Sequence, residues 1–280
     1  DHPAPSQRWL ESGGHDALDP FVAMGFAAAH TTTLRLIPNI VVLPYRNPFI
    51  VAKAGATLDL VSGGRFTLAV GVGYLKREFA ALGVDFDDRA ALFEESLQVI
   101  RDIWTTDDVT VDGKHFTAQG ITAHPRPVSV PHPPIWIGGS SDAAIERTAK
   151  YGTGWQASFE TPEEAGVVVD KILLAATRQG RSIDRDHFSA GFGVRFGSWD
   201  EEPVKKVAAD FEKRTGKEAC RGFVVGGADE ILEHLQAYAD HRVSKFILRP
   251  VGSGDAEMQD QTEQIIEGVL SKSSHLREHL

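Results

Sequence analysis

Short apolar runs alternate along this chain with longer amphipathic segments. The runs "LRLIPNIVVL" (34–43), "RFTLAVGVG" (65–73) and "IWIGG" (135–139) are mostly apolar, and the last two end in glycine. Such runs predict strands that are buried on both faces, as in a parallel sheet. Further strands are predicted in "GWQASF", "HFSAGFGVRF" and "SKFILRP", which gives six core strands.

The segments between these runs carry helix signals. "PFIVAKAGATLDLVSGG" begins at Pro48 and ends at the Gly63–Gly64 pair, which are typical start and stop residues. In "RAALFEESLQVIRDIW" the apolar residues recur at helical spacing. Amphipathic helices are also predicted near 163–178, 203–214 and 228–238, with a helical tail near 256–280.

A hairpin insertion interrupts this alternation. "VTVDGKHFT", near 109–118, is centred on Asp112–Gly113. We expect an Asp-Gly turn here, because this pair readily adopts the positive φ values of a tight hairpin turn.

Alternating strands and helices predict a parallel α/β fold, either doubly wound or closed into a barrel. A closed (β/α)8 barrel needs eight strands, two more than the six identified. The chain opens on "DHPAP", a polar pair and prolines of the kind that follow a strand. We therefore expect one TIM (β/α)8 barrel domain over residues 1–280, whose first strand, first helix and second strand lie upstream of Asp1 and are absent from this chain. A doubly wound sheet is the alternative.

Composition narrows the classes of partner. The chain is 42% apolar and 24% charged, an ordinary globular composition, and its net charge of -10 disfavours nucleic acid and anionic membrane surfaces as partners. The single cysteine, Cys220, cannot form an internal disulfide. No apolar run approaches the roughly 18 residues of a membrane span, and no signal-peptide pattern is present. These features predict a cytoplasmic protein.

The ends of the predicted strands hold the candidate site residues, since parallel α/β folds bind ligands at the carboxyl ends of their strands. They are Asn39 with Ile40, Gly71 with Val72 and Gly73, Gly138 and Gly139 with Ser140 and Ser141, and Arg249. We expect all four strand ends to face one cavity. In the third group, two glycines and good helix-capping residues precede a helix, an arrangement that suits a phosphate. A capped helix without a ligand is the alternative.

Common sequence motifs of other enzyme classes are missing. The "GVG" segment lacks the third glycine of a dinucleotide fingerprint, because that position is Lys76. By their spacing alone, its glycines indicate a tight turn or a close approach of the backbone. There is no P-loop, no G-x-S-x-G and no H-E-x-x-H, so the sequence predicts no metal site.

The order of the motifs L-D-x-x-S-G-G-R, G-V-G, P-P-I-W-I-G-G and G-x-G-W resembles the luciferase-like monooxygenase superfamily, and within it the branch of coenzyme F420-dependent oxidoreductases. The resemblance extends from Asp1 to about Pro250. It implies a TIM barrel, and it agrees with the six strands only if two strands precede Asp1.

The resemblance also implies roles for particular residues. Asp1–His2 resembles a pair at the end of the second barrel strand, where the histidine lies beside the deazaflavin and handles a proton. Histidine suits that role because it ordinarily titrates near neutral pH. Asn39–Ile40 resembles the family's non-prolyl cis peptide, which backs the ring.

The glycine-rich segments resemble cofactor-binding parts of the family. Gly71, Val72 and Gly73 would let the flat ring approach the barrel mouth, and residues 138–141 would hold the phosphate. Some relatives carry a glutamate just after G-x-G, but this chain has Tyr74, so that acid role is not carried over. Arg249 is a candidate contact for an anionic substrate or cofactor tail.

The implied function is F420-dependent hydride transfer to or from a small organic substrate, by a homodimer. An FMN-dependent monooxygenase that uses reduced flavin and O2 is one alternative, and a non-catalytic flavin- or deazaflavin-binding protein is another. The anionic tail of F420 would need a local positive rim in so acidic a protein. Candidates for that rim are Arg46, Lys53, Lys76 and Arg77.

Overall fold

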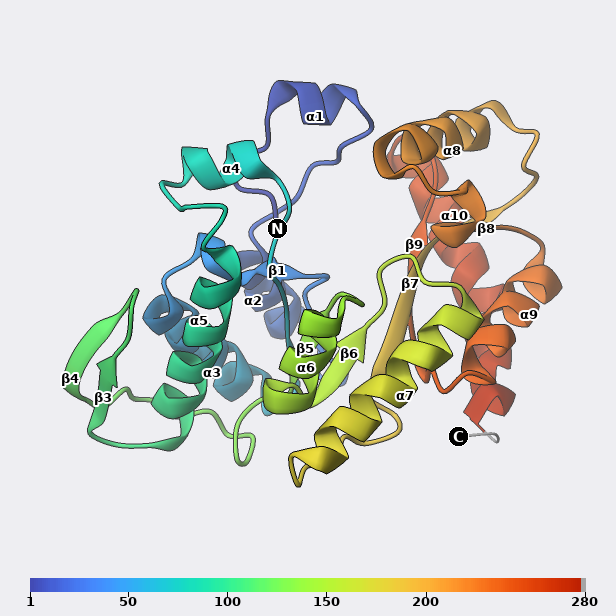
Figure 1. The fold of residues 1–280 in the computed structure, drawn as a ribbon. Coiled ribbons are helices and arrows are strands. Elements are labelled where there is room, and N and C mark those ends of the chain that lie inside the picture. Colours follow the sequence, from blue (N-terminus) through green and yellow to red (C-terminus); the bar gives the residue numbers. More distant parts are fainter. Residues whose placement is uncertain (278–280) are drawn as a thin grey trace. The chain divides into compact units, whose positions relative to one another are not determined.

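A computed structural model of the protein describes residues 1–277 (Figure 1). The chain divides into two compact units, and each has its own hydrophobic core. The first unit comprises Asp1–Leu10, His15–Gly138 and Lys150–Thr153. The second comprises Glu11–Gly14, Gly139–Ala149 and Gly154–Leu280. The α/β architecture predicted from the sequence is confirmed in both units.

Three parallel strands form the sheet of the first unit. They are β1 (Val41–Val42), β2 (Leu68–Gly71) and β5 (Ile135–Gly138), with β2 paired to both of the others. Val41 lies opposite Val70, and Leu68 lies opposite Ile135. The residues of β1 and β2 are all buried, as their unbroken apolar runs predict.

Helices α2 (Pro20–His30), α3 (Pro48–Ser62) and α5 (Arg89–Thr105) pack in this unit (Figure 1). The predicted limits of α3 are confirmed: the Asn47 side chain caps its start, and Gly63 ends it at φ +66°. The Trp104 indole of α5 donates to the Ala52 carbonyl of α3 at 2.8 Å. Gly55 is required at this contact, because a Cβ there would lie 2.7 Å from the Trp104 ring.

Shorter elements complete the first unit: α1 (Gln7–Glu11), the 3-10 turn η1 (Leu43–Tyr45), and α4 (Lys76–Ala81). The hairpin of β3 (Val109–Asp112) and β4 (Thr117–Ile121) is present as predicted.

The turn of this hairpin differs from the sequence prediction. Neither Asp112 nor Gly113 has a positive φ, and a wider loop runs from Gly113 to Phe116. The reason is the Glu95 carboxylate, which accepts hydrogen bonds from the backbone N–H groups of His115 and Phe116. The loop therefore wraps around a side chain of α5, and the turn is centred on Lys114 and His115 instead of Asp112 and Gly113.

The second unit is organised around β7 (Phe188–Phe196). This long strand pairs in parallel with β6 (Gly154–Gln156), β8 (Phe223–Gly226) and β9 (Lys245–Pro250). Strand β8 was missed by the sequence prediction, because its four residues give too short an apolar run between two glycine-containing turns. The part of the chain that the structure describes thus contains three parallel strands in one unit and four in the other. The strands expected upstream of Asp1 stay a prediction.

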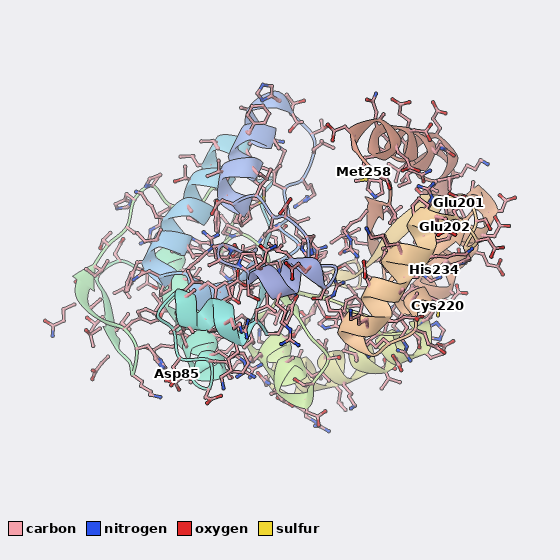
Figure 2. The ribbon with its side chains drawn as sticks, turned by 90° about the horizontal axis from the view of Figure 1, so that it is seen from above. Asp85, Glu201, Glu202, Cys220, His234 and Met258 are labelled. Atoms are coloured by element: carbon pink, nitrogen blue, oxygen red, sulfur yellow. The ribbon has the colours of Figure 1, made fainter. Side chains whose placement is uncertain are left out.

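Helices predicted from amphipathic spacing are present in the second unit. They are α7 (Pro162–Arg178), α8 (Glu202–Thr215) and α9 (Ala228–Ala239), and the unit also contains α6 (Asp142–Tyr151) and the 3-10 turn η2 (Ala219–Arg221). The tail predicted near 256–280 consists of α10 (Asp255–Gly268) and the 3-10 turn η3 (Leu270–Arg277), and residues 278–280 of that prediction lie outside the described residues. Cys220 in η2 is exposed (Figure 2). On α9, burial lowers the pKa of His234, whose ring lies 4.7 Å from that of Phe192.

Within residues 1–277, none of the helices is both long enough and apolar enough to span a bilayer.

Candidate functional site

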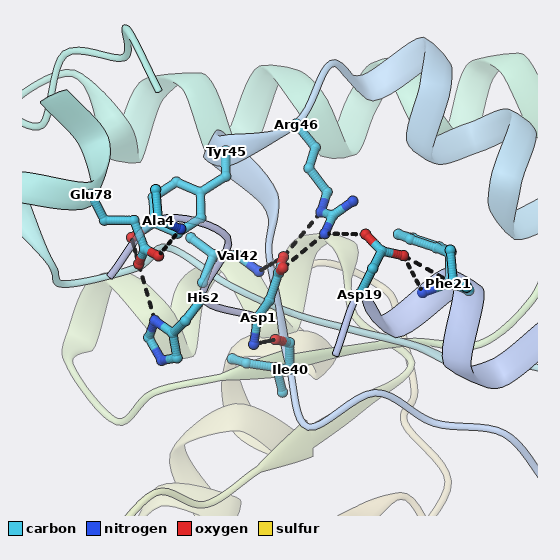
Figure 3. Close-up of polar contacts among 11 residues, drawn as sticks. Asp1, His2, Ala4, Asp19, Phe21, Ile40, Val42, Tyr45, Arg46 and Glu78 are labelled. Carbon is cyan, nitrogen blue, oxygen red and sulfur yellow. Dashed lines mark hydrogen bonds and ion pairs between the residues drawn. The ribbon is translucent and has the colours of Figure 1, made fainter. Parts of the chain in front are cut away.

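His2 lies in a largely buried aromatic setting in the first unit. Its side chain is 8% exposed, and its Nδ1 lies 3.0 Å from Oε2 of Glu78 (Figure 3). The imidazole centroid is 4.5 Å from that of Trp9, 5.4 Å from that of His15 and 6.0 Å from that of Tyr74. The other ring nitrogen, Nε2, has no hydrogen bond to any residue that the structure describes. His2 is therefore held by the protein through Nδ1 alone.

Asp1 fastens the segment that carries His2. Its buried carboxylate accepts bonds from Arg46 at 3.0 and 2.8 Å and from the Val42 backbone N–H at 3.2 Å (Figure 3). Arg46 also reaches Asp19 at 2.8 Å. Partial burial would raise the pKa of Asp19, but the Val22 N–H and Arg46 outweigh it and lower that pKa. The two residues of the predicted Asp–His pair thus differ in role: Asp1 anchors the segment, and His2 is the candidate for proton transfer.

The Asn39–Ile40 peptide bond is cis, as the resemblance implies. The Asp1 backbone nitrogen lies 3.4 Å from the Ile40 carbonyl, so the His2 segment borders this peptide directly (Figure 3). These two predicted site segments, separated by almost forty residues of sequence, are thereby brought together.

The glycines of the "GVG" segment accommodate the protein's own side chains. A Cβ on Gly71 would lie 2.3 Å from Cδ1 of Ile40. Gly73 has φ +84°, and a Cβ there would lie 2.5 Å from Cγ1 of Val42. The space at both positions is therefore used first to pack β2 and its following turn against the β1 segment, and any room for a ring is secondary. Between them, Val72 packs against the core of the first unit.

Glu78 was missed by sequence reasoning. Its side chain is 1% exposed, and besides His2 it accepts the Ala4 N–H and the Tyr45 hydroxyl, each at 2.9 Å. Burial, together with the Glu78 carboxylate, raises the pKa of Tyr45, so the hydroxyl keeps its proton. Neighbouring residues Lys76 and Arg77 are exposed, and nothing in the local pattern distinguishes Glu78 from them.

The predicted phosphate loop begins at the end of β5 with Gly138 in the first unit and continues as Gly139–Ser141 in the second. Gly139 has φ +106°, and its carbonyl accepts the Trp155 indole N–H at 2.8 Å. The Ser141 hydroxyl accepts the Ala144 N–H at 3.2 Å and so caps the start of α6. Ser140 is half-buried beside it.

Arg249 lies near the end of β9, opposite Gly193 of β7. Over its whole side chain the residue is exposed, but partial burial of the guanidinium lowers its pKa, and this group has no salt bridge to the described part of the chain. The prediction that a strand ends at Asn39 is wrong, because Asn39 and Ile40 come just before β1. That all four segments face one cavity stays a prediction, since Arg249 and Gly139–Ser141 belong to the second unit.

Asp184, Asp186 and His187 form a surface group in which three ligand atoms lie within 4.8 Å of one another. Lys245 already pairs with Asp186 at 2.9 Å. The Lys245 ammonium therefore already neutralises one of the two carboxylates. None of the three residues belongs to the predicted site segments.

A comparison with known protein families identifies the family of this chain. Residues 4–220 match the family described as luciferase-like monooxygenase. The chain belongs to this family. The match covers the His2-adjacent segment, the "GVG" turn and the glycine–serine loop, so the family assignment made from motif order is confirmed.

Relatives within the family use two kinds of cofactor, according to their names. The FMNH(2)-dependent dimethylsulfone monooxygenase of Pseudomonas putida is 30% identical over 70% of this chain, and the chain covers 53% of that protein. The F420-dependent glucose-6-phosphate dehydrogenase of Beutenbergia cavernae is 28% identical over 93% of this chain and 85% of its own length. The chain thus spans about half the length of the first relative.

Solved structures agree on the fold. Monooxygenase RslO1 from Streptomyces bottropensis has a TM-score of 0.78 at 23% identity and covers 91% of this chain and 83% of its own. An F420-dependent secondary alcohol dehydrogenase has a TM-score of 0.77 at 18% identity, covering 92% and 86%. The chain therefore has the α/β fold of the luciferase-like structures.

Proposed function

We propose that this protein is an F420-dependent oxidoreductase that transfers a hydride between the deazaflavin and a small organic substrate. The supporting observation is His2, a buried imidazole beside the cis Asn39–Ile40 peptide, with Nδ1 bound and Nε2 open. When bound, F420 supplies the hydride chemistry. The task of the chain is then to bind and orient the reactants and to hold or accept a proton at Nε2 of His2.

The residues present fit such a cofactor. The start of α6, with Gly139 in a left-handed conformation and the Ser140 and Ser141 hydroxyls, offers the donor groups that a phosphate needs. In the first unit, the ring would be held by Asn39, Ile40, Gly71, Val72 and Gly73. Arg249, exposed and without a salt bridge among the described residues, would contact an anionic substrate or the tail.

The F420-dependent relative from Beutenbergia cavernae supports this cofactor, because its match spans most of both chains. An FMN-dependent monooxygenase is the second candidate, supported by the 30% identity to the Pseudomonas putida enzyme. A non-catalytic flavin- or deazaflavin-binding protein is the third. All three predict binding of a flavin-like ring and differ in which cofactor binds and whether turnover follows.

The positive rim proposed for the F420 tail reduces to two residues. Arg46 is neutralised by Asp1 and Asp19, and Lys53 donates to the His124 carbonyl. Lys76 and Arg77 remain exposed on α4.

Cofactor titration tests the proposal. Trp155, which bonds to the Gly139 carbonyl, is a fluorescence reporter next to the loop, and Trp136 lies in β5 just before it. We expect F420 to quench this emission with an affinity that falls as salt rises from about 50 to about 500 mM, and FMN affinity to fall less, because the longer anionic tail engages the exposed cations. Tight FMN binding without F420 binding would favour the monooxygenase instead. Binding of neither would rule out all three candidates.

A glycine substitution tests the phosphate loop itself. Gly139→Val should weaken cofactor binding by about 1–3 kcal/mol, because a β-branched residue is strained at φ +106° and distorts the amides of the loop. Gly180→Val is the matched control, since Gly180 also has a positive φ, at +68°, but has no neighbour that a Cβ would meet. Equal binding by Gly139→Val and the parent would contradict the assignment.

We also propose a homodimer. Leu18, Val22 and Phe26, on and just before α2, are 81%, 74% and 70% exposed, which is unusual for large apolar side chains on a free surface. Sedimentation of the parent and of Phe26→Asp measures the oligomeric state of each directly.

A further inference from the structure

Glu78 is a buried carboxylate with hydrogen-bond contacts to three other residues. At 1% exposure it is shielded from water, and among residues 1–273, whose side chains the structure describes, no lysine or arginine pairs with it. A buried carboxylate is costly unless its oxygens are satisfied. Oε1 accepts the Ala4 N–H, and Oε2 accepts the Tyr45 hydroxyl and lies 3.0 Å from His2 Nδ1 (Figure 3).

Helix α4, which carries Glu78, is held in place by Phe79, the residue that follows Glu78. Gly73 turns the chain after β2, and α4 then places Lys76 and Arg77 outward and buries Glu78 and Phe79. The Phe79 ring is fully buried and packs edge-on against Tyr45, with the centroids 4.7 Å apart. Tyr45 therefore holds the carboxylate in two ways: its ring packs against Phe79 of the same helix, and its hydroxyl donates to Glu78.

This arrangement dictates where the proton of His2 sits. Oε1 accepts the Ala4 N–H and Oε2 accepts the Tyr45 hydroxyl, so neither oxygen has a hydrogen to give, and the contact with His2 assigns the hydrogen to its Nδ1. In the neutral ring the lone pair then lies on Nε2, the nitrogen without a protein partner among the described residues. A carboxylate bonded to Nδ1–H also stabilises the imidazolium that forms when Nε2 takes up a proton.

We propose that Glu78 is the positioning residue of the site: it fixes His2 as the Nδ1–H tautomer and thereby makes Nε2 the atom that exchanges a proton with the substrate. The role in turnover rests on the proposed function, whereas the tautomer itself is a property of the protein without cofactor.

Glu78→Gln gives a sharp test, because the new amide has one oxygen for three donors. The Ala4 N–H is part of the backbone and cannot turn, so the amide oxygen must face it. The amide NH2 then faces Tyr45 and His2. The Tyr45 hydroxyl can rotate to accept, and His2 can accept at Nδ1 only as the Nε2–H tautomer. The substitution should therefore invert the tautomer with almost no change in side-chain volume.

The experiment is a long-range 1H–15N correlation spectrum of histidine-labelled protein without added cofactor, at about pH 8, where an ordinary histidine is neutral. His2→Asn assigns the His2 signals. In the parent, Nδ1 should have the pyrrole-type and Nε2 the pyridine-type shift, and in Glu78→Gln the two should exchange. Tyr45→Phe, which removes a donor but keeps the Glu78–His2 bond, should retain the parental pattern.

An Nε2–H tautomer in the parent, or an unchanged pattern in a folded Glu78→Gln protein, would overturn the inference. F420 titration of the same samples separates it from the proposed function. A parent that binds no F420 would defeat the proposed function while the tautomer result stands.

Discussion

Two histidines of the first unit, His2 and His115, both bond to carboxylates, but they do so in opposite ways. His115 uses both ring nitrogens: Nδ1 lies 2.6 Å from Glu95, and Nε2 lies 2.6 Å from Asp88. His2 uses Nδ1 alone, on Glu78 at 3.0 Å. The imidazole of His115 is saturated, so it can only hold the hairpin loop onto α5, whereas that of His2 keeps one nitrogen for chemistry. The number of engaged nitrogens, more than the presence of a carboxylate, separates a structural histidine from a candidate catalytic one.

Electrostatics reflect the same difference. The hydrogen bond to Asp88, with that to Glu95, raises the pKa of His115. In return, Lys114 and His115 lower the pKa of Asp88. Partial burial would raise the pKa of Glu95, but the bonds from the His115 ring and from Phe116 lower it. The ion pairs of His115 with Asp88 and Glu95, called the hairpin clasp below, stabilise the loop and leave neither ring nitrogen for a ligand.

The largest contrast should appear in turnover. His2→Ala should lower kcat/KM by about 10²- to 10⁴-fold, the usual contribution of a proton-transfer group. His115→Ala should leave it near the parental value, since that ring has no free nitrogen. Cofactor absorbance followed with a substrate identified in a screen of alcohols and sugar phosphates measures both. Equal losses in the two variants would remove the distinction.

A smaller contrast should appear in stability. Glu78→Ala leaves the buried Ala4 N–H and Tyr45 hydroxyl without their acceptor, which should lower the free energy of unfolding by roughly 2–4 kcal/mol. Glu95→Ala also strands backbone donors, but in a loop where water can replace the carboxylate, so a loss of about 1 kcal/mol is expected. Urea unfolding of both variants compares them. A larger loss for Glu95→Ala would mean that the hairpin clasp is the more stabilising of the two.

The smallest effect is a pH dependence of the clasp. Because the folded pKa of His115 is raised, its contribution is full below the ordinary histidine value of about 6.5 and is lost as pH rises through the raised pKa. The lowered pKa values of Asp88 and Glu95 make their contribution full above about 4 and lost as pH falls through them. The Tm difference between the parent and His115→Gln should therefore be greatest between about pH 4 and 6.5 and shrink above this range by at most a few degrees. A difference that stays constant up to pH 9 would contradict this.

Much of the fold was predictable because its signals are local. Pro48 and Gly63 mark the limits of α3 through properties of their own backbones, and the apolar spacing of α5 reflects one buried face. The unbroken apolar runs predicted β2 and β5 for the same reason. Strand β8 was missed because four residues provide too little pattern for a periodicity to be recognised.

The chain by itself determined the α/β class, the family through the order of its motifs, and the candidate roles of His2 and the glycine–serine loop. Only the tertiary structure decided what surrounds them. Glu78 lies 76 positions from His2 and 33 from Tyr45, and no local rule connects residues so far apart in sequence. Likewise, the sequence pattern around Gly71 is typical of a turn that faces a ligand, but the structure shows that a Cβ at this position would clash with Ile40. The physical reason is that burial and hydrogen-bond satisfaction depend on which segments the fold packs together, and a sequence pattern carries only the preferences of each segment alone.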